Sequence, residues 1–479
     1  MTATTSPPGA IRRSTVHARA RRRRSTLADL TGGAALATLV FVVALWLRGG
    51  GIRTLAGPGG FALTTGRLTG LLAADLLLIQ VMLMARIPLV ERAWGQDVLT
   101  RRHRTIGYWS FYLMLAHIVL IVIGYTQSGT MTLLPQTWDI VVNYPGMLLA
   151  VAGTAALVAV VVTSIRAARR RMRYESWHLI HLYAYLGVGL ALPHELWTGY
   201  DFLASPVATV FWWTLWGVAA GAIVIFRLLL PLVRSAFHSL TVEAVVSEAP
   251  GVVSVIMRGR HLDRLPVRAG QFLHWRFLGG PGWSRAHPYS VSAGPSGDRI
   301  RITAATSGDD GSRLATVRPG TRVLVEGPYG ALTADRRRRR DVLLVAAGIG
   351  ITPMRALAEQ VATEPATSGP GGPRPPTVVL LHRVRTPHDA LFGSELSSLS
   401  RWLTVRTVLL VGPRDPAGSW LPAAPGPADP AEVLRRLVPD LAEREVYLCG
   451  PAGWMAAVAV TLRTLGVPLD AIHREDFRW

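Results

Sequence analysis

The chain has 479 residues, enough for two or three domains, and half of them are hydrophobic, with a mean hydropathy of +0.30. Its formal net charge is +21, and every basic side chain is Arg. Short arginine runs near 21–24, 101–104 and 169–171 lie beside apolar stretches, which favours membrane orientation over a nucleic-acid surface. The single cysteine, Cys449, excludes internal disulfides and cysteine-rich metal sites.

The first half of the sequence predicts a multi-pass membrane domain behind a disordered basic tail at 1–29. The basic start is not followed by a small-residue cleavage site, so we interpret it as a tail rather than a signal peptide. Six apolar segments of spanning length are expected near 30–48, 67–88, 105–126, 144–165, 176–198 and 206–230. The arginine-rich connections and the even number of spans predict that both termini are cytoplasmic.

Four histidines occur at matching depths in two of these expected spans. His103 lies at the cytoplasmic mouth of the third span, and His117 follows it after fourteen residues. His181 lies in the fifth span, and His194 follows after thirteen. Ionisable groups inside a bilayer need a partner or a function. At a rise of 1.5 Å per residue each pair is separated by roughly 20 Å along its helix, which leaves room for two haems.

The helical phase supports this interpretation only in part. Fourteen residues nearly complete four turns, but thirteen do not, and Pro193 is expected to distort the turn before His194. His178 competes with His181 as a ligand. The alternative for all of these histidines is interhelical hydrogen bonding. Asp75, in the second span, could hydrogen-bond a ligand, carry protons or make a simple helix contact.

After Arg234 the sequence becomes typical of a small antiparallel barrel or sandwich. Segments at 239–246 and 252–257 alternate partly in period two, as half-buried strands do. Turn signals follow, the last of them at 327–330. We expect this β domain over 236–334, with the arginine run at 336–340 as a linker.

From Asp341 the pattern is β–α–β. A buried strand at 342–347 leads into a glycine-rich turn and a helix near 353–362. Further strands are expected near 377–381, 405–410 and 446–448, so the region 341–479 predicts a parallel sheet with crossover helices. Ligands of such sheets collect at the carboxyl ends of the strands.

Three short motifs carry a family resemblance. The segment 287–292, His-Pro-Tyr-Ser-Val-Ser, resembles the flavin motif of the ferredoxin-reductase superfamily, and 345–354 and 446–451 resemble its nicotinamide motifs. With the histidine pairs in front of them, the chain from about residue 30 resembles the ferric reductase and NADPH oxidase family. The resemblance implies a membrane all-α six-helix haem bundle over 30–232, an antiparallel β-barrel FAD domain over 236–334 and an α/β parallel-sheet NAD(P) domain over 341–479.

The resemblance also assigns residues to FAD. In the family an aromatic ring covers the isoalloxazine and a hydroxyl reaches its reactive nitrogen, positions that Tyr289 and Ser290 match. The superfamily often has Arg where this chain has His287. The pyrophosphate is held at a turn before a short helix, where backbone amides bind anions well. The residues assigned to FAD are His287, Pro288, Tyr289, Ser290, Gly311 and Ser312. The alternatives are an ordinary strand aromatic for Tyr289 and an N-cap for Ser312.

For the nicotinamide nucleotide, the resemblance implies that a glycine turn approaches the diphosphate and that the Cys449 thiol helps position the ring. Ser290 and Cys449 are the catalytic candidates, and an inert thiol is the alternative for Cys449. The residues assigned to the nucleotide are Gly348, Gly350, Thr352, Pro353, Arg383, Cys449, Gly450 and Pro451. Arg383 and Arg385 could grip a 2′-phosphate, which favours NADPH over NADH, or could be solvated. Either Phe477 or Trp479 is expected near the flavin.

The function that the resemblance implies is electron transfer across the cell membrane. NAD(P)H reduces FAD in the cytoplasm, and electrons pass through two b-type haems, the first held by His103 and His181 and the second by His117 and His194. The expected partners are the lipid bilayer and a small-molecule or metal-ion acceptor, without nucleic acid. A ferric ion or chelate is the first choice of acceptor and dioxygen the second. A haem-bearing membrane anchor for a partner protein is the non-enzymatic alternative.

Overall fold

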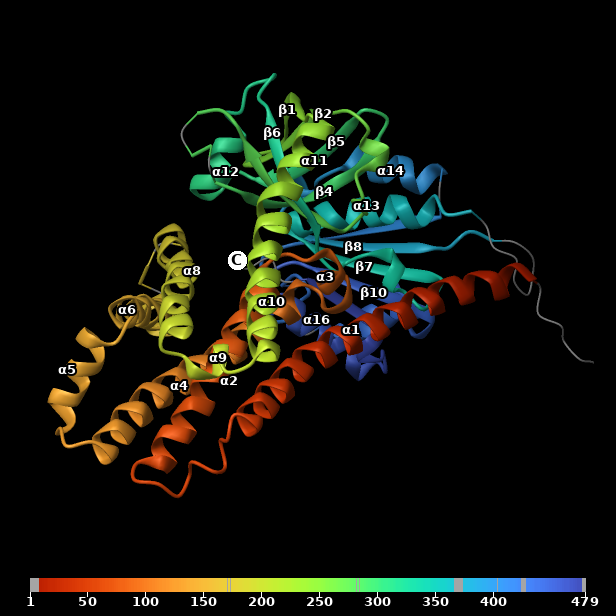
Figure 1. Cartoon of the computed structure of the whole chain (residues 1–479). Helices are drawn as coiled ribbons and strands as arrows, with labels where there is room; N and C mark the ends of the chain where they lie inside the picture. The colour runs from red at the N-terminus through yellow and green to blue at the C-terminus, as the bar shows by residue number, and fades with distance from the viewer. Residues whose placement is uncertain are drawn as a thin grey trace, which may run out of the picture. The chain divides into compact units, whose positions relative to one another are not determined.

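The computed structural model describes residues 8–475, apart from 170, 173, 281, 284, 366–373, 403 and 424–427. The chain divides into two compact units, one formed by Thr26–Leu228 and one that contains Leu229–Trp479. The first unit is helical, and the second is built around two sheets (Figure 1).

The helices of the first unit cover all six segments in which membrane spans are expected. They are α1 (Pro8–Arg48), α2 (Gly60–Met84), α3 (Pro88–Trp94), α4 (Gln96–Ser128), α5 (Leu133–Asn143), α6 (Met147–Ser164), α7 (Arg166–Arg169), α8 (Tyr174–Trp197), α9 (Tyr200–Leu203) and α10 (Pro206–Ala222). A π-helical turn, Ile223–Leu229, continues α10 into α11 (Leu230–His238). The Ser205 hydroxyl caps α10 by accepting a hydrogen bond from the Ala208 amide at 3.2 Å.

The prediction of a disordered tail over 1–29 was wrong for residues 8–29, which are helical. Helix α1 begins at Pro8 and runs without a break into the first expected span. Proline suits a first helical turn, and the arginine, alanine and leucine residues that follow are good helix formers. Residues 1–7 lie outside the described part of the chain.

Five helical segments in the described residues are long and apolar enough to cross a membrane. They are Arg24–Arg48, Gly60–Met84, Val98–Ser128, Met147–Ser164 and Pro206–His238. Helix α8, the fifth expected span, is not among them, although its 24 residues could also span a bilayer by length. Its polar residues, which include His178, His181, His194 and Glu195, lower its apolar character.

Glycines allow the helices of this unit to approach closely. A Cβ added to Gly124 of α4 would lie 2.5 Å from Leu63 Cγ of α2, and one added to Gly153 of α6 would lie 2.7 Å from the Gly187 carbonyl of α8. Small residues at helix crossings are typical of membrane proteins because association there depends on close packing. The two histidine-bearing helices, α4 and α8, are therefore each backed by a closely packed neighbour.

The first sheet of the second unit is antiparallel and six-stranded. Its strands are β1 (Thr241–Ala249), β2 (Val252–Arg258), β3 (Phe272–Phe277), β4 (His287–Ser296), β5 (Arg299–Ala305) and β6 (Val323–Tyr329), in the order β1-β2-β5-β4-β3-β6. The chain just before β6 also bonds to the β1 edge: the Val242 amide donates to Thr321 at 2.9 Å, and the Val323 amide donates to Leu240 at 2.9 Å. Inward side chains such as Val255, Trp275 and Ile302 form its core.

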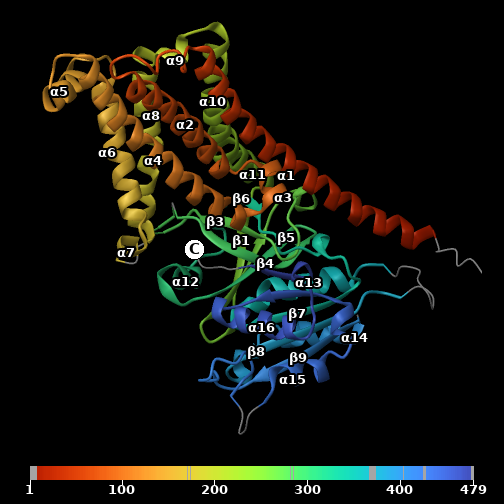
Figure 2. The same ribbon diagram turned by 90° about the horizontal axis from the view of Figure 1, so that it is seen from below.

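The second sheet is parallel and five-stranded. Its strands are β7 (Asp341–Ala347), β8 (Val378–Val384), β9 (Val405–Val411), β10 (Arg444–Cys449) and β11 (Ile472–Glu475), in the order β11-β10-β7-β8-β9. Its helices are α13 (Ile351–Ala362), α14 (Gly393–Trp402), α15 (Pro430–Leu437) and α16 (Ala452–Thr464), and α12 (Gly308–Leu314) belongs to the antiparallel part. Helices α13 and α14 cover one face and α15 and α16 the other, which buries β7 completely (Figure 2).

Candidate functional site

Two pairs of histidine rings face each other between α4 and α8. The ring centres of His103 and His181 are 6.0 Å apart, and those of His117 and His194 are 6.5 Å apart. The structure thus brings the four histidines together in the expected pairs and favours His181 over His178 as the partner of His103. The thirteen-residue spacing is no obstacle, since α8 continues through Pro193 to Trp197.

Hydrogen bonds orient three of these rings. His117 Nδ1 lies 2.8 Å from the Gly66 carbonyl, and His194 Nδ1 lies 2.6 Å from the Ala191 carbonyl. A carbonyl only accepts, so each Nδ1 donates, and the lone pair of the neutral ring is then at Nε2. His181 Nδ1 lies 3.3 Å from the hydroxyl of Ser164. Such bonds fix the tautomer of metal-binding histidines.

The ring separations fit a metal bound by both imidazoles of a pair. A bond from a metal to an imidazole nitrogen is about 2 Å long and the ring centre lies about 1 Å behind that nitrogen, so two rings on one metal have centres about 6 Å apart. Among the described residues, no cluster of three or more His, Cys, Asp or Glu is placed to hold a metal ion. Two histidines, with the other coordination positions of the metal left open, match the donor set that haem iron needs from the protein.

Glycines leave space beside the rings of His117 and His194. A Cβ at Gly70 of α2 would lie 2.5 Å from His117 Nδ1, and a Cβ at Gly146, before α6, would lie 2.8 Å from His194 Cα. Only glycine fits at these positions without a shift of the neighbour. The surroundings of these two rings therefore depend on residues outside α4 and α8.

Other ionisable groups of this unit bond to residues of neighbouring helices. Thr38 lies 3.1 Å from the fully buried Asp75 carboxylate, which favours the simple helix contact among the three roles considered for Asp75. Arg67 and Asp201 form a bidentate ion pair at 2.5 and 2.7 Å. The Trp216 indole donates to Glu195 at 3.2 Å.

The flavin motif forms the start of strand β4. His287 and Ser290 are buried, and the rings of His287 and Tyr289 stack with their centres 6.0 Å apart. The Trp275 indole of β3 donates to the Tyr289 carbonyl at 3.0 Å, which fixes the strand behind the aromatic ring. The motif therefore lies on a rigid central strand.

The phosphate-binding turn expected at Gly311 and Ser312 lies inside a helix rather than before one. Helix α12 begins at Gly308, so the two residues belong to its middle. A Cβ at Gly311 would lie 2.3 Å from the Ala305 carbonyl, which explains the glycine by close packing. The free amides at the helix start belong to earlier residues than the resemblance implied.

The glycine turn and the cysteine turn lie side by side at the carboxyl ends of β7 and β10. Gly348–Gly350 forms a tight turn before α13, and a Cβ at Gly350 would lie 2.3 Å from the Cys449 carbonyl. Thr352 and Pro353 lie in the first turn of α13. Backbone amides at this helix start suit a diphosphate. The residues assigned to the nucleotide around these turns are thus brought together, with Gly450 and Pro451 beside them.

The Cys449 thiol is fully buried at the end of β10. Burial raises its pKa well above its usual range, and the Glu475 carboxylate acts in the same direction. The thiol is therefore neutral at physiological pH. Such a group can position a ring but is a poor nucleophile.

Three other predicted residues have different outcomes. The Arg383 guanidinium donates to the Pro413 carbonyl at 2.8 Å, so one of its donors is committed to a neighbouring loop. Phe477 and Trp479 lie outside the described residues.

Two functional candidates escaped the sequence reasoning. His382 of β8 is 1% exposed, and its Nε2 lies 3.2 Å from the Gly348 carbonyl of the glycine turn. Glu475 of β11 is buried and is in register with Cys449. Each occupies the carboxyl-terminal half of a parallel strand, and this position, rather than any motif, is the signal that could have identified them.

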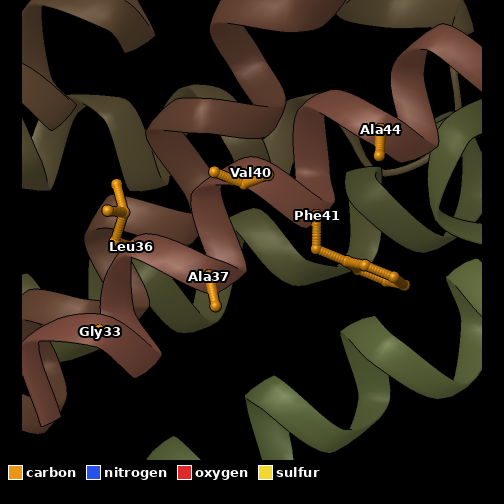
Figure 3. Close-up of a pocket in the computed structure, with 6 residues that line it drawn as sticks. All are labelled: Gly33, Leu36, Ala37, Val40, Phe41 and Ala44. Atoms are coloured by element: carbon orange, nitrogen blue, oxygen red, sulfur yellow. The ribbon is translucent and has the colours of Figure 1, made fainter. Parts of the chain in front are cut away.

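A pocket on α1 has no chemistry of this kind. Figure 3 shows its lining residues along one face of the helix. They are Gly33, Leu36, Ala37, Val40, Phe41 and Ala44. All six are apolar, so this surface suits hydrocarbon rather than a redox group.

Comparisons with known proteins identify two parts of the chain. Residues 69–192 match the ferric reductase like transmembrane component, and residues 344–460 match the oxidoreductase NAD-binding domain. The chain therefore joins a ferric reductase-like transmembrane component to a ferredoxin-reductase-type module, and the resemblance stated from the motifs is confirmed. The transmembrane match includes three of the four paired histidines, His103, His117 and His181, and ends two residues before His194.

Curated relatives match about half of the chain. The ferredoxin reductase component of 3-ketosteroid-9-alpha-monooxygenase from Mycolicibacterium smegmatis is 31% identical over 238 residues, which are 48% of this chain and 62% of the relative. The flavohemoprotein of Deinococcus radiodurans is 29% identical, over 50% of this chain and 59% of its own. The chain thus spans less than two thirds of the length of these relatives.

A solved structure also covers half of the chain. The FAD/NAD-binding domain of nitric oxide dioxygenase from Vibrio cholerae is 24% identical, with a TM-score of 0.37, and the match covers 50% of this chain and 98% of that one.

Proposed function

We propose that this chain, which joins a ferric reductase-like transmembrane component to an oxidoreductase NAD-binding domain, carries electrons across a membrane from NAD(P)H to an acceptor on the outer face. The observation that carries the proposal is the pairing of four histidines from two helices at ring separations of 6.0 and 6.5 Å. Two independent pairs at the separation expected for axial ligands favour electron transfer over simple helix-to-helix hydrogen bonding.

The two units would hold different redox groups. His103 and His181 would hold an inner haem, and His117 and His194 an outer one, with the Nδ1 bonds to Gly66 and Ala191 keeping Nε2 free for iron. When bound, haem supplies one-electron chemistry and FAD converts a hydride into single electrons. The protein fixes their distances and surroundings.

In the second unit Tyr289 would cover the flavin ring and Ser290 would hydrogen-bond its reactive nitrogen. The Gly348–Gly350 turn and the start of α13 would hold the nucleotide diphosphate. Neutral Cys449 would pack against the nicotinamide and exclude water, because its raised pKa keeps it uncharged. We assign FAD and NADPH to these sites, with NADH as the alternative nucleotide.

The direction of transfer follows from the charge distribution. Arginine-rich connections favour a cytoplasmic location for both termini, and for the second unit, in a multi-pass cell-membrane protein. Electrons therefore arrive at the inner pair first. We propose a ferric ion or chelate as the acceptor that takes them from the outer pair.

The test uses the full chain, purified in detergent with FAD and examined anaerobically by absorption spectroscopy. We expect a bis-histidine b-type haem spectrum that becomes reduced when NADPH is added. A haem spectrum that stays oxidised would refute electron transfer between the units. Reoxidation of the reduced protein by ferric chelate faster than by air would support a reductase, and the reverse order would identify an oxidase that makes superoxide.

A further inference from the structure

A group of charged side chains outside every motif connects the antiparallel sheet to the parallel-sheet domain. At its centre the Glu395 carboxylate, on α14, lies between two arginines. Arg301 of β5 donates to both of its oxygens, at 2.6 and 2.8 Å, and Arg355 Nε of α13 lies 2.7 Å from Oε2. We call these three residues the Glu395 clamp. One carboxylate thus holds guanidinium groups from a strand of one sheet and a helix of the other.

Hydroxyl groups extend the clamp into the antiparallel sheet. Arg301 Nε donates to the Ser292 hydroxyl at 3.0 Å, and the Thr303 hydroxyl lies 2.9 Å from the same oxygen. Ser254 lies 2.7 Å from Thr303. Ser254, Ser292 and Thr303 are all buried. The clamp is therefore anchored on three adjacent strands, β2, β5 and β4, rather than on a loop.

The clamp reaches the last residue of the flavin motif and the helix of the nicotinamide motif. Arg355 Nη1 donates to the Ser292 carbonyl at 3.3 Å, and Ser292 is two residues from Ser290 along β4. On the same interface the Thr352 hydroxyl, in the first turn of α13, donates to the Thr303 carbonyl at 3.4 Å. The two motifs are thus tied to each other through α13.

The charges of this group balance. Arg355 also pairs with Glu359 at 2.5 Å, so two guanidinium groups face two carboxylates. Burial alone would raise the pKa of Glu395, but the hydrogen bond from Arg301 and the charge of Arg355 outweigh it and hold the pKa below its usual value. The carboxylate is therefore charged at neutral pH. Removing its charge leaves two arginines without their shared partner, which is unfavourable because Arg355 is buried and Arg301 and Glu395 are partly buried.

We propose that Glu395 is a positioning residue that fixes the flavin motif relative to the nicotinamide motif and so sets the geometry of hydride transfer. The inference rests on the proposed function, because it assumes FAD at Ser290 and a nicotinamide nucleotide at the glycine turn. Hydride transfer requires the donor carbon and the acceptor nitrogen in near contact, and a misplacement of about 1 Å can cost a factor on the order of a hundred in rate. Each nucleotide would still find its own binding residues intact.

The test is Glu395→Gln in the full chain in detergent, loaded with FAD and mixed anaerobically with NADPH in a stopped-flow instrument. We expect flavin reduction at saturating NADPH to slow by about tenfold or more, while the NADPH concentration for half-maximal rate changes by less than about threefold. Glu432→Gln is the matched control, because Glu432 pairs with Arg436 on the exposed face of α15. It should reduce at the wild-type rate.

The outcomes separate the clamp from the proposed function. A wild-type flavin that NADPH does not reduce would refute hydride transfer itself, and the clamp with it. A normal wild-type rate with an unchanged Glu395→Gln rate would overturn the clamp alone, as would a weakened apparent affinity for NADPH at an unchanged maximal rate. If Glu395→Gln does not retain flavin, Arg355→Lys carries the same expectation, because it keeps the charge but loses the forked geometry.

Discussion

At the scale of single residues, His382 links the glycine turn, Gly348–Gly350, to the core of the parallel sheet. It is almost fully buried in β8, and its Nε2 lies 3.2 Å from the Gly348 carbonyl. Burial lowers its pKa to about 4, although the hydrogen bond to Gly348 acts in the opposite direction. The ring is therefore neutral at pH 7, with its proton on Nε2 donated to the turn.

This burial predicts a pH-dependent stability. The unfolded chain takes up a proton at His382 near pH 6.5, whereas the folded chain does so only near 4. The stability contributed by the neutral ring is fully present above pH 6.5 and falls between pH 6.5 and 4, by on the order of 3 kcal/mol in total. Below pH 4 no further loss arises from this group.

Urea unfolding of the full chain, followed by tryptophan fluorescence between pH 7.5 and 4, measures this effect. His382→Gln is the comparison because glutamine does not titrate, and it should lose less stability than the wild type as the pH falls. Other groups titrate equally in both chains, so the difference isolates His382. Parallel loss of stability in the two chains would contradict the assignment.

At the scale of helices, the contact between α2 and α4 controls the outer histidine pair. Gly70 of α2 is so close to His117 that a Cβ would lie 2.5 Å from Nδ1. Gly70→Ala must therefore displace the ring or separate the helices. We expect the outer haem to be lost while the inner one stays, so that haem content falls from two to about one per chain.

The matched control is Gly189→Ala, since Gly189 lies on α8, one of the two histidine-bearing helices, and a Cβ there meets nothing within 4 Å. Haem per chain is measured from the pyridine haemochrome spectrum of each purified variant. Two haems in Gly70→Ala would show that the ring tolerates the extra atom and that the packing of α2 does not govern the site.

The helices also show which structural elements the sequence patterns could predict. The six expected spans are all helical because runs of apolar residues of that length form helices in hydrocarbon. The short helices α3 and α5, and the helical start of α1, were missed because they are not apolar runs of spanning length. The pairing of His194 with His117 was predicted from the resemblance and not from helical phase, since thirteen residues do not complete a whole number of turns; the structure brings the two rings together.

At the scale of the whole molecule, local motifs were predictable and contacts between distant segments were not. The turns of the nicotinamide motifs follow strands β7 and β10, as the sequence predicted, and the flavin motif forms the start of β4. Glu395 and Glu475 are separated in sequence from every residue that they touch across the fold, so no spacing could indicate them. The shift of Gly311 into α12 has the same cause, because its role depends on packing against Ala305.

The division of the chain into two units predicts that nucleotide oxidation survives the loss of the outer haem site. His117 belongs to the unit Thr26–Leu228, whereas every residue assigned to FAD and NAD(P)H belongs to the other. His117→Ala would remove one of the two histidines proposed to hold the outer haem, and a single histidine does not hold a b-type haem in the bis-imidazole state. We therefore expect loss of the outer haem and of ferric chelate reduction.

In the same His117→Ala protein, NADPH oxidation with a dye that accepts electrons directly from flavin should remain within about twofold of the wild type, because the flavin and nucleotide residues are unchanged. The inner haem, held by His103 and His181, should still be reduced by NADPH. This pattern would place the break in electron transfer between the two histidine pairs. Loss of dye reduction in a variant that retains its FAD would instead require that the outer pair supports the second unit, against the modular organisation of the chain.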